Sequence, residues 1–329
     1  MKKQKWHFIV FVCLLMLTFN TIMRNPYMNV FFSSESIPAA APVISTKNVD
    51  QPLIKKIEAF AKTHEIKPVD AAVDRVWKAT PGYNGLAVDI NASYQKMKAK
   101  HKFNKDDVVY KEVPPKKKLN DLPPSPIYRG NPQKPMVALL INVAWGNEYL
   151  PKILKVLNKY DIKATFFLDG SWVKKYPDLA MMISEEGHEI GNHAYSHPDL
   201  KQSSKQETYK ELKKTNDVIE ATLDVKPKWF APPSGSFTQQ TVDVAHKLDM
   251  KTILWTVDTV DWKKPPTMEM VRRVVPKTTA GTMILMHPTK PVAEGLEQMI
   301  NGIEEKGYRF GTVSELMSEK RIGSFENNK

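Results

Sequence analysis

Three histidines have the types and spacing of groups that could bind a metal ion or move a proton. His193 and His197 lie four residues apart in the run GNHAYSHP, and His287 follows the apolar segment MILM later in the chain. Histidine is a common metal ligand and also titrates near neutral pH. For the pair taken alone, a metal-binding role and a role as surface residues remain open alternatives.

The local sequence predicts how the two neighbouring imidazoles are held. A spacing of four places two side chains on the same face of a helical turn. Pro198 disfavours helix beyond His197. We therefore expect one helical turn directly after the strand predicted over 188–193, with both imidazoles on its face.

The elements that must position these residues alternate along the chain from residue 136. Short apolar segments are separated by amphipathic helices, a pattern that predicts a parallel sheet, open or closed. Functional groups gather at the carboxyl ends of parallel strands. We expect a shared site because polar or chemically informative positions fall at such ends: Asn142, His193, Ala231, Asp258, Asp261 and His287. The predicted strands are 136–143, 164–169, 188–193, 227–230, 251–257, 282–287 and 308–313.

An ordered set of motifs in this region resembles the catalytic domain of the polysaccharide deacetylase family, also called the NodB homology domain. The motifs are ATFFLDG, GHEIGNH, SH, FAPPSG, WTVDTVDW, ILMH and FGTVSEL, between residues 164 and 316. The resemblance implies an α/β fold of the distorted (β/α) barrel type. It also implies an ancestral reaction, the metal-dependent hydrolysis of acetyl groups on an N-acetylated envelope glycan, either peptidoglycan or a chitin-like polymer.

The resemblance also implies roles for particular residues. His193 and His197 match the family's histidine ligands for a divalent metal, zinc or cobalt. His287 matches the acid that protonates the leaving group, and Asp261 matches the carboxylate that tunes this acid. Contacts to substrate are implied for four residues, namely Trp262, Leu285, Pro233 and Ser234.

Three positions depart from the family's pattern. Asn142 stands at the general-base position, Val143 at the position of the metal-binding aspartate, and Ala231 at that of an orienting arginine. An amide cannot accept the proton of the attacking water, and valine has no ligand atom. A catalytic zinc normally keeps three protein ligands, and losing a general base costs about two to four orders of magnitude in rate. We therefore expect weak or absent deacetylase activity.

Two functions remain open. One is a deacetylase with altered chemistry that still uses its histidines and a metal. The other is a non-catalytic envelope protein that binds a glycan or another partner in the ancestral cleft. No register of residues 139–146 supplies an Asp or Glu, and we expect the nearby Asp169, Asp199 and Glu148 to face solvent.

The N-terminal residues indicate export. Lysines precede an apolar run over 8–19, which is typical of a secretory signal and short for a membrane-spanning helix. A cleaved signal peptide and an uncleaved membrane anchor remain alternatives for residues 1–24. The only cysteine, Cys13, lies inside this run, so the exported part has no thiol for a metal site or disulfide.

The remaining chain divides into five expected segments. Inside the second of them we expect a helix from Asp50 and strands near 86–90 and 108–110. Prolines in the third disfavour helix and predict an extended spacer. The segments are a tether (25–48), a small α/β domain (49–112), a Pro- and Lys-rich linker (113–135), the NodB-type domain (136–320) and a tail (321–329).

The charge of the chain favours anionic partners. The formal net charge is +12 and the pI is about 9.4. Only scattered lysines and short runs such as 116–118 occur, whereas a nucleic-acid-binding protein needs a basic helix or an aromatic reading surface. We therefore expect an envelope glycan and, through the N-terminal segment, a membrane as partners, and no nucleic acid.

Overall fold

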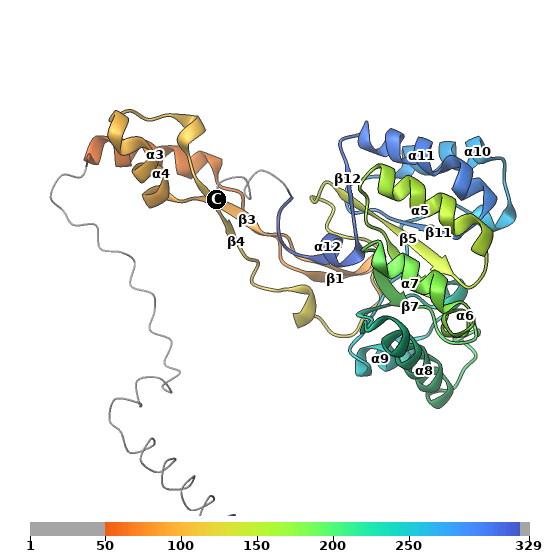
Figure 1. Cartoon of the computed structure of the whole chain (residues 1–329). Coiled ribbons are helices and arrows are strands. Elements are labelled where there is room, and N and C mark those ends of the chain that lie inside the picture. Colours follow the sequence, from red (N-terminus) through yellow and green to blue (C-terminus); the bar gives the residue numbers. More distant parts are fainter. Residues whose placement is uncertain (1–49, 323–329) are drawn as a thin grey trace, which may run out of the picture. The chain divides into compact units, whose positions relative to one another are not determined.

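A computed structural model describes residues 50–322 of the protein (Figure 1). The predictions for residues 1–24 and 25–48, and for most of the tail, lie outside these residues. Within the described range, no helix is long and apolar enough to cross a membrane.

The elements that precede the main sheet are two helices and two small antiparallel sheets. The helix expected from Asp50 is present as α3 (Gln51–His64). Helix α4 (Ile90–Met97) begins after Asp89, whose carboxylate accepts a hydrogen bond from the Ala92 amide at 3.0 Å. The sheets pair β1 (Ala72–Asp74) with β2 (Lys78–Thr80), and β3 (Gly85–Val88) with β4 (Tyr110–Val113). The strand predicted over 108–110 is wrong in its first two residues, because a 3-10 turn (Lys105–Asp107) ends at Val108.

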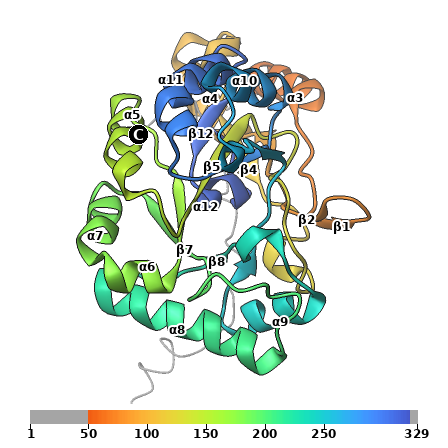
Figure 2. The same ribbon diagram turned by 90° about the vertical axis from the view of Figure 1, so that its right-hand side faces the viewer.

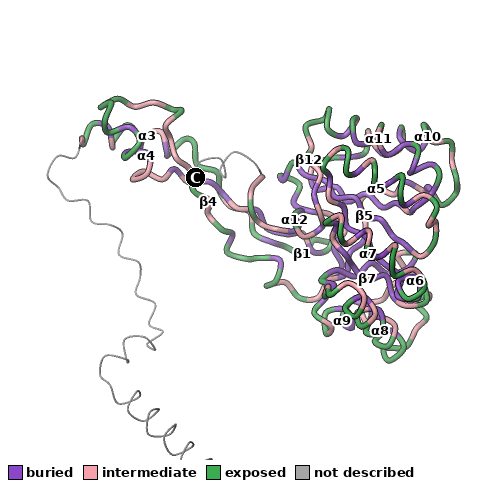
Figure 3. The backbone as a smooth tube through the Cα atoms, viewed as in Figure 1, coloured by how far each residue is buried: buried purple, intermediate pink, exposed green. Residues whose placement is uncertain are grey.

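The rest of the described chain is built on one parallel sheet of eight strands. Its order is β10-β11-β5-β6-β7-β8-β9, and β12 also pairs with β5. The central strand β5 (Met136–Val143) has the predicted bounds and is buried at every residue (Figure 3). The other strands are β6 (Thr165–Leu168), β7 (Glu189–Asn192), β8 (Trp229–Phe230), β9 (Lys251–Thr252), β10 (Val257–Asp258), β11 (Met283–Met286) and β12 (Arg309–Gly311).

The sheet curls into a half-barrel, and the single strand predicted over 251–257 is wrong. This segment forms two strands, since β9 pairs with β8 and β10 pairs with β11. Between them, the amide of Leu254 donates to the carbonyl of Ile127 at 2.8 Å instead of to a neighbouring strand of the sheet. The segment therefore runs from one edge strand of the sheet to the other, and in the described residues β9 and β10 do not pair with each other.

Alternate residues of β5 enter two different hydrophobic cores, as the two-residue period of a strand requires. Val137, Leu139, Ile141 and Val143 belong to the core beneath the helices. Met136, Ala138 and Leu140 belong to a second core with Phe167 and Trp229. The helices range around the sheet (Figure 2). They are α5 (Leu150–Lys159), α6 (Gly170–Lys175), α7 (Pro177–Glu185), α8 (Lys205–Leu223), α9 (Gln239–Lys247), α10 (Thr267–Val274), α11 (Lys290–Glu304) and α12 (Val313–Met317).

The proline-rich segment 113–135, predicted as an extended spacer, is packed against the fold over part of its length. Ile127 is buried, and its amide donates to the carbonyl of Thr252 at 2.9 Å. Asn131 and Lys134 are also buried. Ile127 thus pairs with the edge of the sheet, and a 3-10 turn (Leu119–Asp121) precedes it in the same segment.

Candidate functional site

His193 is a buried, neutral histidine with one free ring nitrogen. It follows β7, and its Nδ1 lies 2.7 Å from the carbonyl oxygen of Ala231. A carbonyl only accepts, so Nδ1 carries the proton and Nε2 keeps a lone pair. Burial, then the nearby His197 and, more weakly, His287 lower the pKa of His193 to about 3, against the opposing effect of the hydrogen bond to the Ala231 carbonyl. This is the orientation of a metal-ligating histidine, which donates its other N–H to an oxygen.

The helical turn predicted for His193–His197 is wrong. The residues after β7 form an irregular loop, with Ala194 and His197 at φ values of 60° and 54°. The Glu211 carboxylate on α8 holds this loop by accepting the amides of Tyr195 and Ser196, each at 2.9 Å. The two imidazoles still meet, edge to face, with ring centroids 5.2 Å apart. His197 itself is exposed.

The pair of His287 and Asp261 is intact and well supported. His287 Nδ1 lies 3.1 Å from Asp261 Oδ1, and Asp261 is fully buried. The hydroxyls of Thr259 and Thr289 also donate to this carboxylate, the latter at 2.9 Å. Neither threonine was assigned a role from its position in the chain, although Thr259 lies inside the WTVDTVDW motif. Asp261 therefore fixes the Nδ1–H tautomer of His287 and leaves Nε2 for chemistry.

The three substituted positions lack the groups that hydrolysis requires. Asn142 ends the face of β5 that holds Leu140, and its buried Oδ1 accepts no hydrogen bond from the described residues. The Val143 side chain lies in the core beneath the helices. Ala231 follows β8 and contributes its carbonyl to His193, not a charged side chain. None of the three can deprotonate a water molecule, and the side chains of Val143 and Ala231 have no atom that could bind a metal.

The nearby carboxylates do not replace the missing acids. The expectation that Asp169 faces solvent is wrong, because it is 2% exposed and caps α6 by accepting the Trp172 amide at 2.9 Å. Burial raises the pKa of Asp169, opposed by hydrogen bonds from Ser171 and Trp172. Asp199 is exposed and accepts a hydrogen bond from Ser236, and Glu148 is exposed. An Asp directly before Gly-Ser-Trp-Val is a helix-capping signal that the sequence already offered.

The residues implied to contact substrate differ in exposure. Trp262 is 51% exposed, and the Lys263 ammonium lies 5.0 Å from the centroid of its ring. Leu285 is buried in β11, Pro233 is buried after β8, and Ser234 beside it is exposed. An aromatic residue without an assigned role, Trp145, is stacked on His287 at a centroid distance of 5.8 Å. The only signal for Trp145 in the sequence was a large apolar side chain in the loop directly after β5.

Comparison with known proteins identifies the family. Residues 129–253 match the family described as Polysaccharide deacetylase. The uncharacterized protein YlxY of Bacillus subtilis is 49% identical over 315 residues, which are 96% of this chain and 97% of that protein. This chain belongs to the polysaccharide deacetylase family. A second member, the peptidoglycan-N-acetylglucosamine deacetylase of Bacillus cereus, is 32% identical over 199 residues, or 59% of this chain and 72% of the relative.

Solved structures of the polysaccharide deacetylase family include a protein described as a pseudoenzyme. Wild-type BA3943 of Bacillus anthracis, a CE4 family pseudoenzyme, is 51% identical and has a TM-score of 0.77 over 82% of this chain and 96% of that chain. A BA3943 mutant with restored enzymatic activity has the same TM-score at 50% identity, covering 82% of this chain and 99% of its own. The likeness therefore takes in elements outside residues 129–253.

Polysaccharide deacetylases are generally metal-dependent, and the residues of this site do not form a complete metal-binding set. Between residues 50 and 322, no group of three or more His, Cys, Asp or Glu side chains could hold a metal ion. His193 and His197 offer two donors, whereas a catalytic zinc takes three protein ligands. Valine supplies none at the third position, so we derive no catalytic step through a metal.

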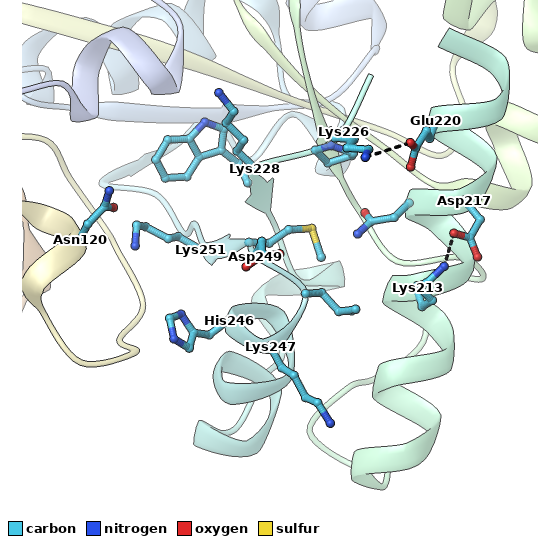
Figure 4. A pocket seen from close by; sticks show the side chains of 15 residues that line it. Asn120, Lys213, Asp217, Glu220, Lys226, Lys228, His246, Lys247, Asp249 and Lys251 are labelled. Carbon is cyan, nitrogen blue, oxygen red and sulfur yellow. Dashed lines mark hydrogen bonds and ion pairs between the residues drawn. The ribbon is translucent and has the colours of Figure 1, made fainter. Parts of the chain in front are cut away.

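A separate hollow of about 800 Å³ lies at the amino-terminal ends of β8 and β9 (Figure 4). Lys213 pairs with Asp217, and Lys226 pairs with Glu220 at 3.3 Å. Burial lowers the pKa of Lys251, which also lines the hollow. This lysine-rich groove contains none of the predicted site residues, which follow the opposite ends of the strands.

Proposed function

We propose that this polysaccharide deacetylase family member acts in the bacterial cell envelope, where it binds an N-acetylated glycan and has weak or no deacetylase activity. The carrying observation is the loss of base and metal ligand together at Asn142 and Val143. An amide in place of the base removes proton abstraction, and an apolar side chain in place of the third ligand removes the activated water. Ala231 fits the same loss, because an orienting arginine has no function without the carboxylate.

Retention of the rest of the cleft supports binding. His193 keeps a free Nε2, His287 keeps its carboxylate partner, and Trp262 presents an exposed ring. Relatives named as peptidoglycan deacetylases make peptidoglycan the first glycan to test. In this proposal the cleft recognises the acetylated sugar, and turnover is lost because the groups that attack the acetyl carbon are missing.

The chain's layout is part of the proposal. Residues 1–24 export the protein as a cleaved signal or hold it in the membrane as an anchor, and 25–48 act as a tether. Residues 49–112 form a small α/β domain and 136–320 the NodB-type domain, joined by 113–135 and followed by the tail 321–329. The basic start before the apolar run over 8–19 supports export, and the peptidoglycan deacetylases among the relatives support an envelope location.

The decisive experiment measures turnover and binding in parallel. Acetate release from chitotetraose and purified peptidoglycan is assayed with added zinc, cobalt or nickel, beside the Bacillus cereus relative. We expect a rate at least about a hundredfold below that relative, together with co-sedimentation of the protein with peptidoglycan. Absence of binding to both glycans would refute the glycan-binding function.

A second candidate is a deacetylase with altered chemistry, and the intact His287–Asp261 pair favours it. In this case acetate release would be robust and would be abolished in His287→Ala. Inactivity with all three metals excludes this candidate.

A further inference from the structure

The loop after β5 holds Trp145 in one place. Gly146 has a φ of +85°, and a Cβ added there would lie 2.0 Å from the carbonyl oxygen of Pro288. Only glycine therefore lets the loop pack against the residue next to His287. On the other side, the Asn147 side-chain oxygen accepts a hydrogen bond from Trp172 Nε1 at 2.7 Å. The indole is thus carried on backbone fixed from two directions.

Trp145 covers His287 but remains accessible. The indole and imidazole planes differ by 10°, with centroids 5.8 Å apart, which is an offset stack. Despite this contact, Trp145 is 45% exposed. The exposed part of the Trp145 indole is therefore a hydrophobic surface that a ligand can contact.

A cavity of about 840 Å³ adjoins Trp145, within the range of roughly 300–1,000 Å³ of small-molecule sites. It is lined by the loop after β5, the approach to α10 and the first turns of α11. Thr289, which donates to Asp261, belongs to its wall. Two residues that contact the His287–Asp261 pair, Trp145 and Thr289, thus form part of the cavity wall.

The chemistry of this wall matches an uncharged sugar. The lining residues include two lysines, Lys264 and Lys290, and two glutamates, Glu148 and Glu294, so the charges balance, and Lys290 pairs with Glu294 at 3.8 Å. A pyranose has an apolar face of C–H groups that can lie on an aromatic ring, and hydroxyl and acetamido groups around its edge that need donors and acceptors. The lysine-rich groove at β8 and β9 has no comparable exposed aromatic platform among its lining residues.

We infer that Trp145 and this cavity form a saccharide subsite, in which an N-acetylated hexosamine next to the ancestral reaction centre stacks on the indole. The inference rests on the proposed glycan-binding function and specifies where the sugar lies. In this arrangement the loop that carries Trp145 binds the sugar beside His287, the acid position, while the base position holds Asn142.

Calorimetric titration of the full chain in mild detergent with chitotetraose tests the subsite. We expect Trp145→Ala to weaken binding by about tenfold or more, since aromatic anchors dominate binding energies, and Trp145→Phe to retain most of the affinity. Tyr209→Ala is the matched control, because Tyr209 is an aromatic of similar exposure, 39%, on α8 beside the lysine-rich groove. It should bind as the wild type does.

The outcomes separate the subsite from the proposed function. If folded Trp145→Ala binds chitotetraose as tightly as the wild type, the subsite is refuted and glycan binding stands. If the wild type binds neither chitotetraose nor peptidoglycan, both are refuted. Thermal melting of each variant confirms that a change in affinity is not caused by unfolding.

Discussion

The Asp261 carboxylate lies 3.1 Å from Nδ1 of His287 and is fully buried, whereas the His287 side chain retains 18% of its exposure. Thr259 and Thr289 complete the hydrogen bonds of this carboxylate. In the proposed assignment the acid half of the site thus keeps its full support, while Asn142 and Val143 stand at the base and metal positions. Because Asp261 is buried and accepts these hydrogen bonds, it stabilises the fold whether or not the protein turns over a substrate.

Asp261→Ala should therefore destabilise the protein more than His287→Ala does. Removing Asp261 leaves two threonine hydroxyls and one imidazole N–H without their acceptor, at a cost of about 3 kcal/mol. Removing His287 deletes one partner of a carboxylate that keeps two others, and should cost about 1 kcal/mol. Urea denaturation measures both free energies of unfolding. Equal losses would contradict the structural role of Asp261.

The stability of the fold should fall below pH 6.5 because of His188. Burial, helped by the charge of Lys163, lowers the pKa of His188 from 6.5 to about 4. Its Nδ1 accepts the Ala164 amide at 3.2 Å, so the folded protein holds it neutral. Between pH 6.5 and 4, His188 binds a proton in the unfolded chain but not in the folded protein. The free energy of unfolding therefore decreases as the pH is lowered. His193, with a pKa of about 3, adds the same trend.

His188→Gln tests this linkage. The slope of unfolding free energy between pH 6 and 4.5 should be reduced by up to about 1.4 kcal/mol per pH unit, the contribution of one proton. His246→Gln, at an exposed position on α9, controls for the loss of a histidine. An unchanged slope in His188→Gln would show that another group dominates the acid response.

Restoring the substituted positions should recover metal binding. Asn142→Asp, Val143→Asp and Ala231→Arg together should bind zinc and release some acetate, in keeping with the BA3943 mutant described as having restored enzymatic activity. Val143→Asp alone places a carboxylate in an apolar core and should cost about 3 kcal/mol or more without metal. Zinc at a hundred times its Kd should return about 2.7 kcal/mol to the triple variant.

Thermal melting with and without zinc measures this recovery. His193→Ala/His197→Ala in the triple background should abolish the zinc-dependent rise in Tm. A folded triple variant that neither binds zinc nor releases acetate would mean that the cleft has diverged beyond these three positions.

Gly146→Ala should damage both stability and glycan binding. The new Cβ would meet the Pro288 carbonyl at 2.0 Å, so the loop that carries Trp145 must move. We expect a cost of about 2 kcal/mol or more and weaker chitotetraose binding. Gly307→Ala is the matched control, because φ is +81° there and nothing lies within 4 Å of the added Cβ. It should cost about 1 kcal/mol and leave binding unchanged.

Elements whose signal is local could be predicted from the amino-acid sequence. The apolar run of β5 predicted its bounds, and strand-helix alternation predicted the parallel sheet, because periodicity and apolarity depend only on neighbours in the chain. The ordered motifs pointed to the family and to the three departures at Asn142, Val143 and Ala231. The cap formed by Asp169 was also readable from its position before a helix, although we expected a surface carboxylate.

Features that depend on contacts between residues far apart in the chain could be seen only in the folded structure. The loop from His193 to His197 is not helical because Glu211, on another helix, accepts two of its amides. The segment 251–257 breaks into β9 and β10 because it leaves one edge of the sheet for the other. Trp145 reaches His287 because Gly146 packs on Pro288. These contacts join residues far apart in the chain, and their energies appear only once the sheet has brought them together.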